Sequence, residues 1–290
     1  MASYSMWLLE YARCTVQPVS SVLYGQHNKG VRLLSFSYCV LQGEGHTIML
    51  DVGYDYASYG KDLADRYGVT DWQPPDNVLG KIGLRPDDVD TVILTHAHFD
   101  HMGNIRSFPR AHVFLQKREL LDWVWALSLP RRFTSLTTAM DPQDILNAYA
   151  LSFEERLTLL DGAVQDIRPG IHALPAFDGH TFGNQVVVID TLSAERQERW
   201  AYAGDTAYSY ENIRGVDNDG VYRAVGLATG STVNMLMSID DMVKTVDGDI
   251  NRIIVGHDPT SWSIYPSRQT PEDGLHVAEL SLAPGQRSRL

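Results

Sequence analysis

Four side chains of the types that bind metal ions fall within six residues of the sequence, in the segment THAHFDH at residues 95–101. They are His96, His98, Asp100 and His101, and they follow residues 90–95, a short apolar run typical of a buried strand. Such side chains beside a core strand would cost stability if they stayed unpaired, so we expect them to bind metal. His96 and His98 can face one ion where the loop leaves the strand extended. Asp100 and His101 then turn toward a second ion, which predicts two half-sites.

Further ligands are needed, because zinc takes about four ligands and a catalytic zinc keeps one position for water. Three candidates stand in loops after later strands, each directly after a glycine: His180, Asp205 and His257. Glycine permits a tight turn and a close approach of the backbone to the site. The expected ligand sets are His96, His98 and His180 for one ion, and Asp100, His101 and His257 for the other, with the Asp205 carboxylate bridging both.

The elements that position these residues alternate between strands and helices along the chain. We expect a hairpin over residues 31–51, further strands at 90–95, 112–115, 171–174, 185–190, 200–203 and 252–255, and helices at 56–67, 76–83 and 231–246. A helical insert is expected at about residues 117–165, with a second amphipathic helix around 153–160. The 290 residues are interpreted as one α/β domain, with a polar tail after Asp273 that could fray.

Composition excludes some classes of partner. The formal charge of −12 argues against nucleic acid, which usually requires a basic face. Cys14 and Cys39 are too few for a disulfide framework and indicate a reducing compartment. The N-terminal residues contain no basic leader and no long apolar run, so we expect a cytoplasmic protein without a membrane partner. Five more histidines are assigned ordinary surface or hydrogen-bonding roles: His27, His46, His112, His172 and His276.

The sequence elements HAHFDH, GHT, GD and GH, in this order and spacing, resemble the metallo-β-lactamase superfamily over about residues 31–260. The resemblance implies an αβ/βα sandwich of two mixed sheets flanked by helices, with the metal site at one edge of the sheets. Flavodiiron oxygen reductases on this fold carry a glutamate at the position of His98, so His98 favours hydrolysis over redox chemistry.

A narrower resemblance is to the N-acyl homoserine lactonase family, which has a tyrosine three residues after the bridging aspartate, as Tyr208 is here, and a phenylalanine at the position of Phe99. Asp178 and Phe182 depart from the prolines common in the Gly-His-Thr region. The resemblance implies a dinuclear metallohydrolase that opens the ring of a small cyclic ester, an N-acyl homoserine lactone or another small lactone, by attack of a metal-bridging hydroxide. That activity would be quorum quenching.

Several alternatives stay open from sequence. The same site suits a cyclic amide or imide hydrolase, a glyoxalase II-like thioesterase, or a metal-binding sensor without turnover. Zinc is the default ion, with manganese, iron or cobalt as alternatives. The oligomeric state is open, with a homodimer as one alternative.

Roles are also expected for residues around the ligands. Asp100 or Asp205 takes the proton of the nucleophile, and Tyr208 donates a hydrogen bond to the developing oxyanion. Phe99 and Phe182 are candidates for the substrate pocket. Asp51 either supports the metal loop or has no such role. Asp258 is expected to be an exposed turn acid, with the orientation of His257 as the alternative. Two insert tryptophans either pack the helices or line the substrate mouth: Trp123 and Trp125.

Overall fold

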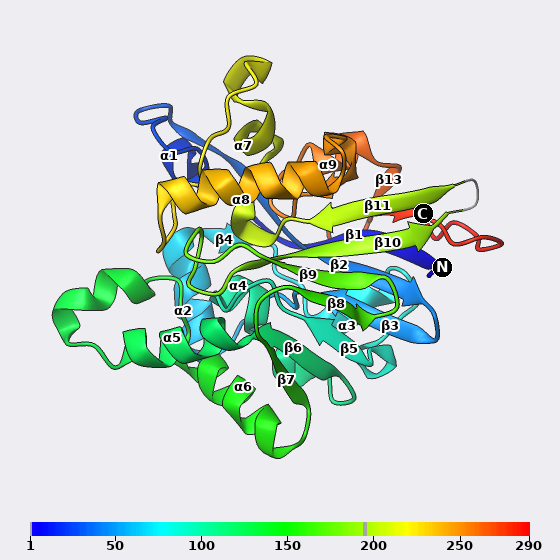
Figure 1. Ribbon diagram of the computed structural model, residues 1–290, viewed down its shortest axis with the longest axis horizontal. Helices are drawn as coiled ribbons and strands as arrows, with labels where there is room; N and C mark the ends of the chain where they lie inside the picture. The colour runs from blue at the N-terminus through cyan, green and yellow to red at the C-terminus, as the bar shows by residue number, and fades with distance from the viewer. Residues whose placement is uncertain (1, 194–195) are drawn as a thin grey trace.

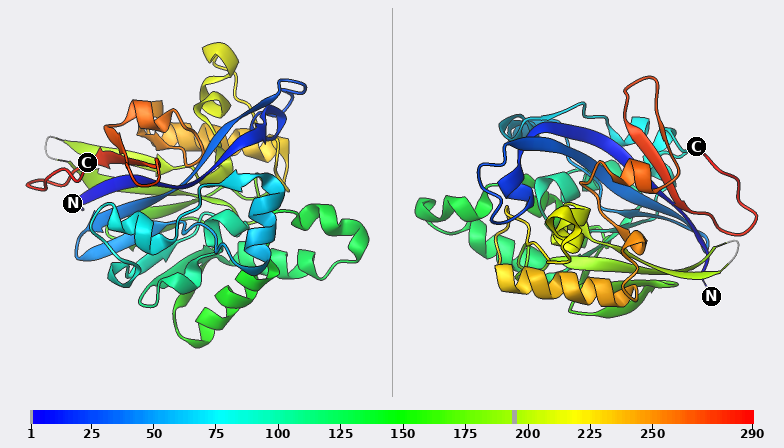
Figure 2. Two further views of the ribbon diagram at one scale, coloured as in Figure 1. Left: turned by 180° about the vertical axis from the view of Figure 1, so that it is seen from behind. Right: turned by 90° about the horizontal axis from the view of Figure 1, so that it is seen from above.

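In the computed structural model, which describes residues 2–193 and 196–290, the strands form two sheets that pack face to face with helices on their outer faces (Figure 1). This arrangement confirms the expected αβ/βα sandwich. Figure 2 shows from two further directions that helix α8 (Thr232–Thr245) covers the second sheet, while most other helices lie against the first.

The first sheet is mixed and contains the long N-terminal strand. Its strand order is β13 (Ser267–Gln269), β14 (His276–Ser281), β1 (Tyr4–Pro18), β2 (Val31–Gly43), β3 (His46–Leu50), β5 (Thr91–Ile93), β6 (His112–Gln116) and β7 (Leu157–Leu160), with β4 (Val69–Thr70) paired to β1. Strands β3, β5, β6 and β7 run parallel to one another. The expected hairpin is confirmed as β2 and β3, which pair antiparallel.

The second sheet has the order β12 (Ile253–Ile254), β11 (Gln197–Tyr202), β10 (Gln185–Leu192), β9 (Ile171–Pro175) and β8 (Val164–Arg168). Only β11 and β12 pair in parallel within it. The carboxyl ends of β5 and β3 in the first sheet, and of β11 and β12 in the second, each lead into a segment that carries predicted site residues. Ligand sites of α/β folds gather outside such strand ends.

Strand β1 shows how the core is divided. Successive side chains of a strand point to opposite faces. Met6 and Leu8 belong to the cluster between the sheets, whereas Trp7 and Leu9 belong to the cluster that packs against the helices. Both faces of the first sheet are therefore buried along the N-terminal part of β1.

The helices have recognisable ends. They are α1 (Val19–Val22), α2 (Ser58–Tyr67), α3 (Pro75–Gly80), α4 (Phe99–Met102), α5 (Lys117–Leu127), α6 (Pro142–Phe153), α7 (Tyr210–Arg214), α8 and α9 (Ser261–Ile264). The predicted helix at 231–246 is confirmed as α8: the Ser231 side chain caps it by accepting from the Asn234 N–H, and Met235, Ile239 and Met242 are its buried side chains.

Two expectations about the region after residue 117 and about the tail are wrong in part. Helix α6 ends at Phe153, Glu155 has a left-handed φ of 56°, and residues 157–160 form β7 instead of an amphipathic helix. Residues 276–281, part of the tail that could fray, form β14, which pairs with β1. The helices of the insert lie at one end of the molecule (green in Figure 1). Within the described residues, no helix combines the length and apolar character needed to cross a membrane.

Candidate metal centre

The seven predicted ligands come from loops that follow strands of both sheets. His96 and His98 follow β5, and Asp100 and His101 lie in α4, whose N-cap residue is His98. Asp205 lies in a short 3-10 segment, Gly204–Thr206, soon after β11. His180 lies between β9 and β10, and His257 follows β12. The fold brings all seven side chains together at one edge of the sandwich.

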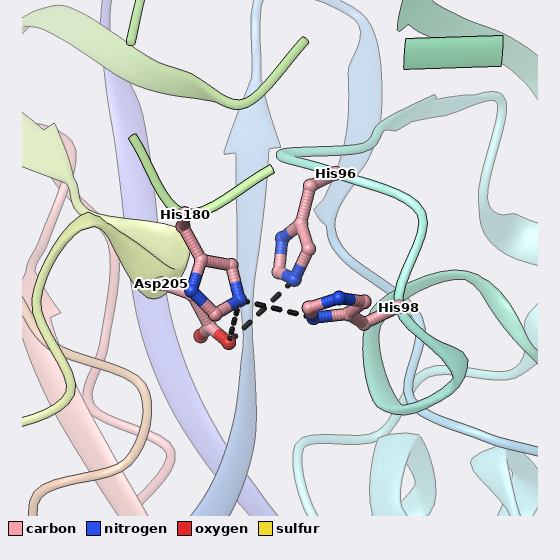
Figure 3. Close-up of side chains that lie close together, drawn as sticks. All are labelled: His96, His98, His180 and Asp205. Atoms are coloured by element: carbon pink, nitrogen blue, oxygen red, sulfur yellow. Dashed lines mark hydrogen bonds and ion pairs between the residues drawn. The ribbon is translucent and has the colours of Figure 1, made fainter. Parts of the chain in front are cut away.

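The first group consists of His96, His98, His180 and Asp205, and one ligand atom of each lies within 4.8 Å of the others (Figure 3). Nε2 of His180 is 3.0 Å from Nδ1 of His98 and 3.0 Å from Oδ2 of Asp205. Nε2 of His96 is 3.5 Å from the same carboxylate oxygen. Three imidazoles and one carboxylate thus converge on one point.

The second group consists of Asp100, His101 and His257. Oδ2 of Asp100 lies 3.6 Å from Nε2 of His101 and 3.7 Å from Nε2 of His257. Oδ1 of Asp205 lies 3.1 Å from each of these two nitrogens. One carboxylate therefore reaches both groups, with a different oxygen toward each.

The donor set fits divalent metal ions. Nε2 of His96 is buried and has no hydrogen-bond partner among the described residues. Such an orphaned buried atom costs about 1–3 kcal/mol, which coordination would offset. Burial lowers the pKa of His96 and of His98 well below the usual value, so both rings are neutral, as metal ligation requires. Burial alone would raise the pKa of Asp205, but the surrounding histidines outweigh it and hold that pKa well below the ordinary value.

Neighbouring groups fix the ring orientation of the second-group histidines. Oδ2 of Asp51 is 2.8 Å from Nδ1 of His101, and Oδ1 of Asp51 accepts from the Thr95 N–H at 2.7 Å. Nδ1 of His257 is 2.8 Å from the Ser35 carbonyl, so it must carry the proton and leave Nε2 free to ligate. Asp51 is therefore placed to support the metal loop, one of the two alternatives left by the sequence.

Asp258 differs from expectation. Its side chain is buried, and it accepts from the backbone N–H of Tyr210 and of Thr260, both at 2.8 Å. The interpretation as an exposed turn acid is wrong because the carboxylate holds the start of α7.

Glu119 was missed by sequence reasoning. It lies in the first turn of α5 and is completely buried, and its carboxylate accepts hydrogen bonds from two of the three segments that carry the first ligand group, the one with His96 and His98 and the one with His180. Nothing in the local sequence KRELLDW distinguishes it from an ordinary acidic residue at a helix start, because its partners are far away along the chain.

A cavity of about 400 Å³, counting its open mouth, adjoins both groups. Predicted residues among its lining are His98, Phe99, Asp100, Tyr208 and His257, and the other lining residues are Gln17, Leu34, Phe36, Tyr67, Ala139 and Leu227. The walls are mainly apolar. Outside the predicted site residues, Gln17 contributes a side-chain amide, whereas the hydroxyl of Tyr67 donates to the Thr138 carbonyl.

Phe182 does not line this cavity. Its ring packs 4.9 Å from that of Trp123 and 6.1 Å from that of Trp125, so the expectation of a pocket role is not met there. Trp123 is completely buried and packs the insert, whereas Trp125 is about half exposed.

Comparison with known proteins identifies related chains. Residues 32–257 match the sequence model of the metallo-beta-lactamase superfamily. The N-acyl homoserine lactonase AttM of Rhizobium johnstonii is 23% identical over 259 residues, 81% of this chain and 85% of that protein. A probable metallo-hydrolase of Mycobacterium tuberculosis is 28% identical over 139 residues, 47% of this chain, and the match spans only 43% of that relative.

Solved structures share the fold. A quorum-quenching N-acyl homoserine lactone lactonase superposes with a TM-score of 0.64 at 20% identity, over 90% of this chain and 95% of that chain. The dizinc quorum-quenching lactonase AidC, in complex with a product, superposes with a TM-score of 0.63 at 16% identity, over 99% and 97% of the two chains. At these identities the likeness establishes the architecture alone.

Proposed function

The chain belongs to the metallo-β-lactamase superfamily of metallohydrolases, and we propose that it is a dinuclear member that opens the ring of an N-acyl homoserine lactone or a related small lactone. The observation that carries this proposal is the position of Tyr208. Its ring centroid lies 5.7 Å from that of His180 and 5.0 Å from that of His257, so the tyrosine overhangs both ligand groups at the cavity wall.

Tyr208 is suited to stabilise a developing oxyanion. Burial, followed by the nearby Asp205 and Asp100, raises the pKa of its phenol well above the ordinary value. The hydroxyl therefore stays protonated at neutral pH and can donate to the oxygen on which charge develops. Two divalent ions held by the His/Asp groups, which we propose to be zinc, would supply an activated water and polarise the substrate carbonyl.

The two acids have different surroundings. Both oxygens of Asp205 face histidine nitrogens of the two groups, which suits a bridging ligand. Asp100 lines the cavity and keeps its side chain 11% exposed. We therefore assign to Asp100 the role of taking the proton of the attacking water or hydroxide and passing that same proton to the leaving ring oxygen, since it alone of the two acids lines the space where substrate would lie.

Gln17 favours a substrate that carries an amide. The Ser21 hydroxyl donates its only proton to the Pro18 carbonyl at 2.7 Å, so it can only accept from Gln17. That contact orients the Gln17 NH₂ toward Ser21, and its carbonyl oxygen accepts no hydrogen bond from the residues that the structure describes. An acceptor among apolar walls suits an amide N–H next to an acyl chain, as in an N-acyl homoserine lactone.

The test is hydrolysis of a matched panel by protein of measured metal content: N-acyl homoserine lactones, γ-lactones of equal chain length, a cyclic imide, a glutathione thioester and a phosphodiester. We expect lactone turnover that is lost on chelation and in His98→Ala and Asp205→Ala. His112→Ala is the matched control, because His112 bonds Thr158 away from the site. Turnover of the imide or the thioester without the lactones would refute the proposed substrate and support the corresponding alternative.

A further inference from the structure

Glu119 joins two segments that are far apart in the sequence. Its Oε1 accepts from the Ala97 N–H and from Trp123 Nε1, both at 2.8 Å. Its Oε2 accepts from Thr181 Oγ1 at 2.8 Å and from the Gly183 N–H at 2.6 Å. The side chain is completely buried, and both carboxylate oxygens are fully used.

Two partners of Glu119 are chain neighbours of ligands in the first group. Ala97 lies between His96 and His98, and Thr181 directly follows His180. Trp123, which Glu119 also holds, packs with its ring centroid 5.8 Å from that of His98. The hydrogen bonds of Glu119 given by the structure include no residue of the Asp100–His101–His257 group, whose support comes from Asp51 and from the Ser35 carbonyl.

The contact is tight, and its donors favour the ionised form of Glu119. A Cβ added at Gly183 would lie 2.3 Å from the backbone nitrogen of Glu119, so the loop after His180 approaches the start of α5 as closely as glycine allows. Burial raises the pKa of Glu119, but three of its four partners, the Ala97 and Gly183 N–H groups and Trp123 Nε1, can only donate, which favours the ionised carboxylate. The N-terminal turn of α5 adds a dipole that favours the negative charge.

We propose that Glu119 is a positioning residue that sets the spacing of His96, His98 and His180, and so controls the affinity of one of the two metal ions while leaving the other unaffected. The inference rests on the metal binding in the proposed function but not on the substrate. Loss of a group that orients metal ligands through hydrogen bonds typically lowers metal affinity by about 10- to 100-fold.

The experiment measures zinc stoichiometry and the two stepwise affinities by chelator competition, for the wild type, Glu119→Gln and Thr181→Val. His98→Ala and His257→Ala provide reference patterns for loss of the first and of the second group. We expect Glu119→Gln to lower the affinity for one ion by about 10- to 100-fold, and this ion should be the one whose binding is lost in His98→Ala. Thr181→Val, which removes a single donor at little risk to folding, should weaken the same ion by a smaller factor.

Glu279→Gln is the matched control. Glu279 is also a buried glutamate that accepts from a tryptophan Nε1 and a backbone N–H, those of Trp7 and Arg289, but within the described part of the chain it has no hydrogen bond to a metal loop. It should keep both affinities. Equal weakening of both ions in Thr181→Val, or a lower melting temperature with both affinities unchanged, would overturn the inference, as would a wild type that binds fewer than two ions. A wild type that binds two ions without opening lactones would refute only the substrate.

Discussion

Replacing Tyr208 with phenylalanine removes one hydroxyl and keeps the ring. That ring is 5% exposed and packs between His180 and His257, so the substitution leaves the packing of both ligand groups in place. If the hydroxyl donates to the oxyanion, its interaction forms only as charge develops during the reaction. The loss should then appear in kcat and not in KM.

The magnitude follows from the kind of hydrogen bond that is lost. A hydrogen bond to a charged group contributes about 1.5–3 kcal/mol. Since each 1.36 kcal/mol is a tenfold change in rate, kcat should fall roughly 10- to 150-fold. Initial rates of lactone hydrolysis in a pH-indicator assay, with metal content measured for each preparation, would give both constants.

Tyr210→Phe is the matched control for this substitution. The hydroxyl of Tyr210 bonds the Ile253 carbonyl at 3.1 Å and the Tyr265 hydroxyl at 3.0 Å, and Tyr210 does not line the cavity. The control should lower the melting temperature and keep kcat within about twofold. An unchanged kcat in Tyr208→Phe, or a loss carried entirely by KM at full metal content, would refute the oxyanion role.

Three further predictions use other parts of the structure. Gln17→Leu should raise KM for N-acyl homoserine lactones about 2- to 13-fold, since one hydrogen bond contributes about 0.5–1.5 kcal/mol. KM for γ-lactones without the amide should not rise. An equal rise in KM for both kinds of lactone would contradict the assigned contact. Burial raises the pKa of the Asp144 carboxyl to about 8. Above about pH 4 the unfolded chain releases this proton while the folded protein keeps it, so the contribution of Asp144 to stability is fully present below about pH 4 and is lost as pH rises toward 8. The difference in melting temperature between pH 5 and pH 8.5 should therefore shrink in Asp144→Asn, and an unchanged difference would contradict this cause. Gly204→Ala should lower the free energy of unfolding, measured by urea titration, by about 1–3 kcal/mol. The reason is that φ of Gly204 is +50° and that an added Cβ would lie 2.6 Å from Cβ of Thr95. Gly80→Ala is the control and should not destabilise the protein comparably, because a Cβ at Gly80 would have nothing within 4 Å.

The sequence predicted those strands whose turns and patterns are local. The hairpin of β2 and β3 was predicted from the glycine-containing turn between two apolar runs. In the structure Glu44 and Gly45 of this turn have positive φ values of 52° and 79°, as a two-residue hairpin turn requires. Strand β1 was missed because its first nine residues are buried on both faces, which removes the alternation that marks a half-buried strand. Residues 157–160 read as helix but pair with β6, a tertiary interaction that local propensity does not contain.

The expected ligands were accessible from sequence because histidine and aspartate at strand ends are rare without a partner. Their grouping into one site followed from the number of ligands that zinc needs and from their shared position after strands. Glu119 was not accessible, since its partners Ala97, Thr181 and Gly183 lie 22, 62 and 64 residues away. Phe182 was misplaced for the same reason: only the packing of α5 shows that its ring meets Trp123 outside the cavity.

The insert and the metal loop are joined on both sides of His98. The Ala97 N–H donates to Glu119 of α5 at 2.8 Å, and the Phe99 N–H donates to the carbonyl of Ala139 at 3.0 Å, a residue that also lines the cavity. A change in the insert that shifts α5 relative to Ala139 would therefore move His98, an expected metal ligand, together with the part of the cavity wall formed by Ala139. Substrate preference and metal affinity should change together in such variants, because the same two hydrogen bonds hold both.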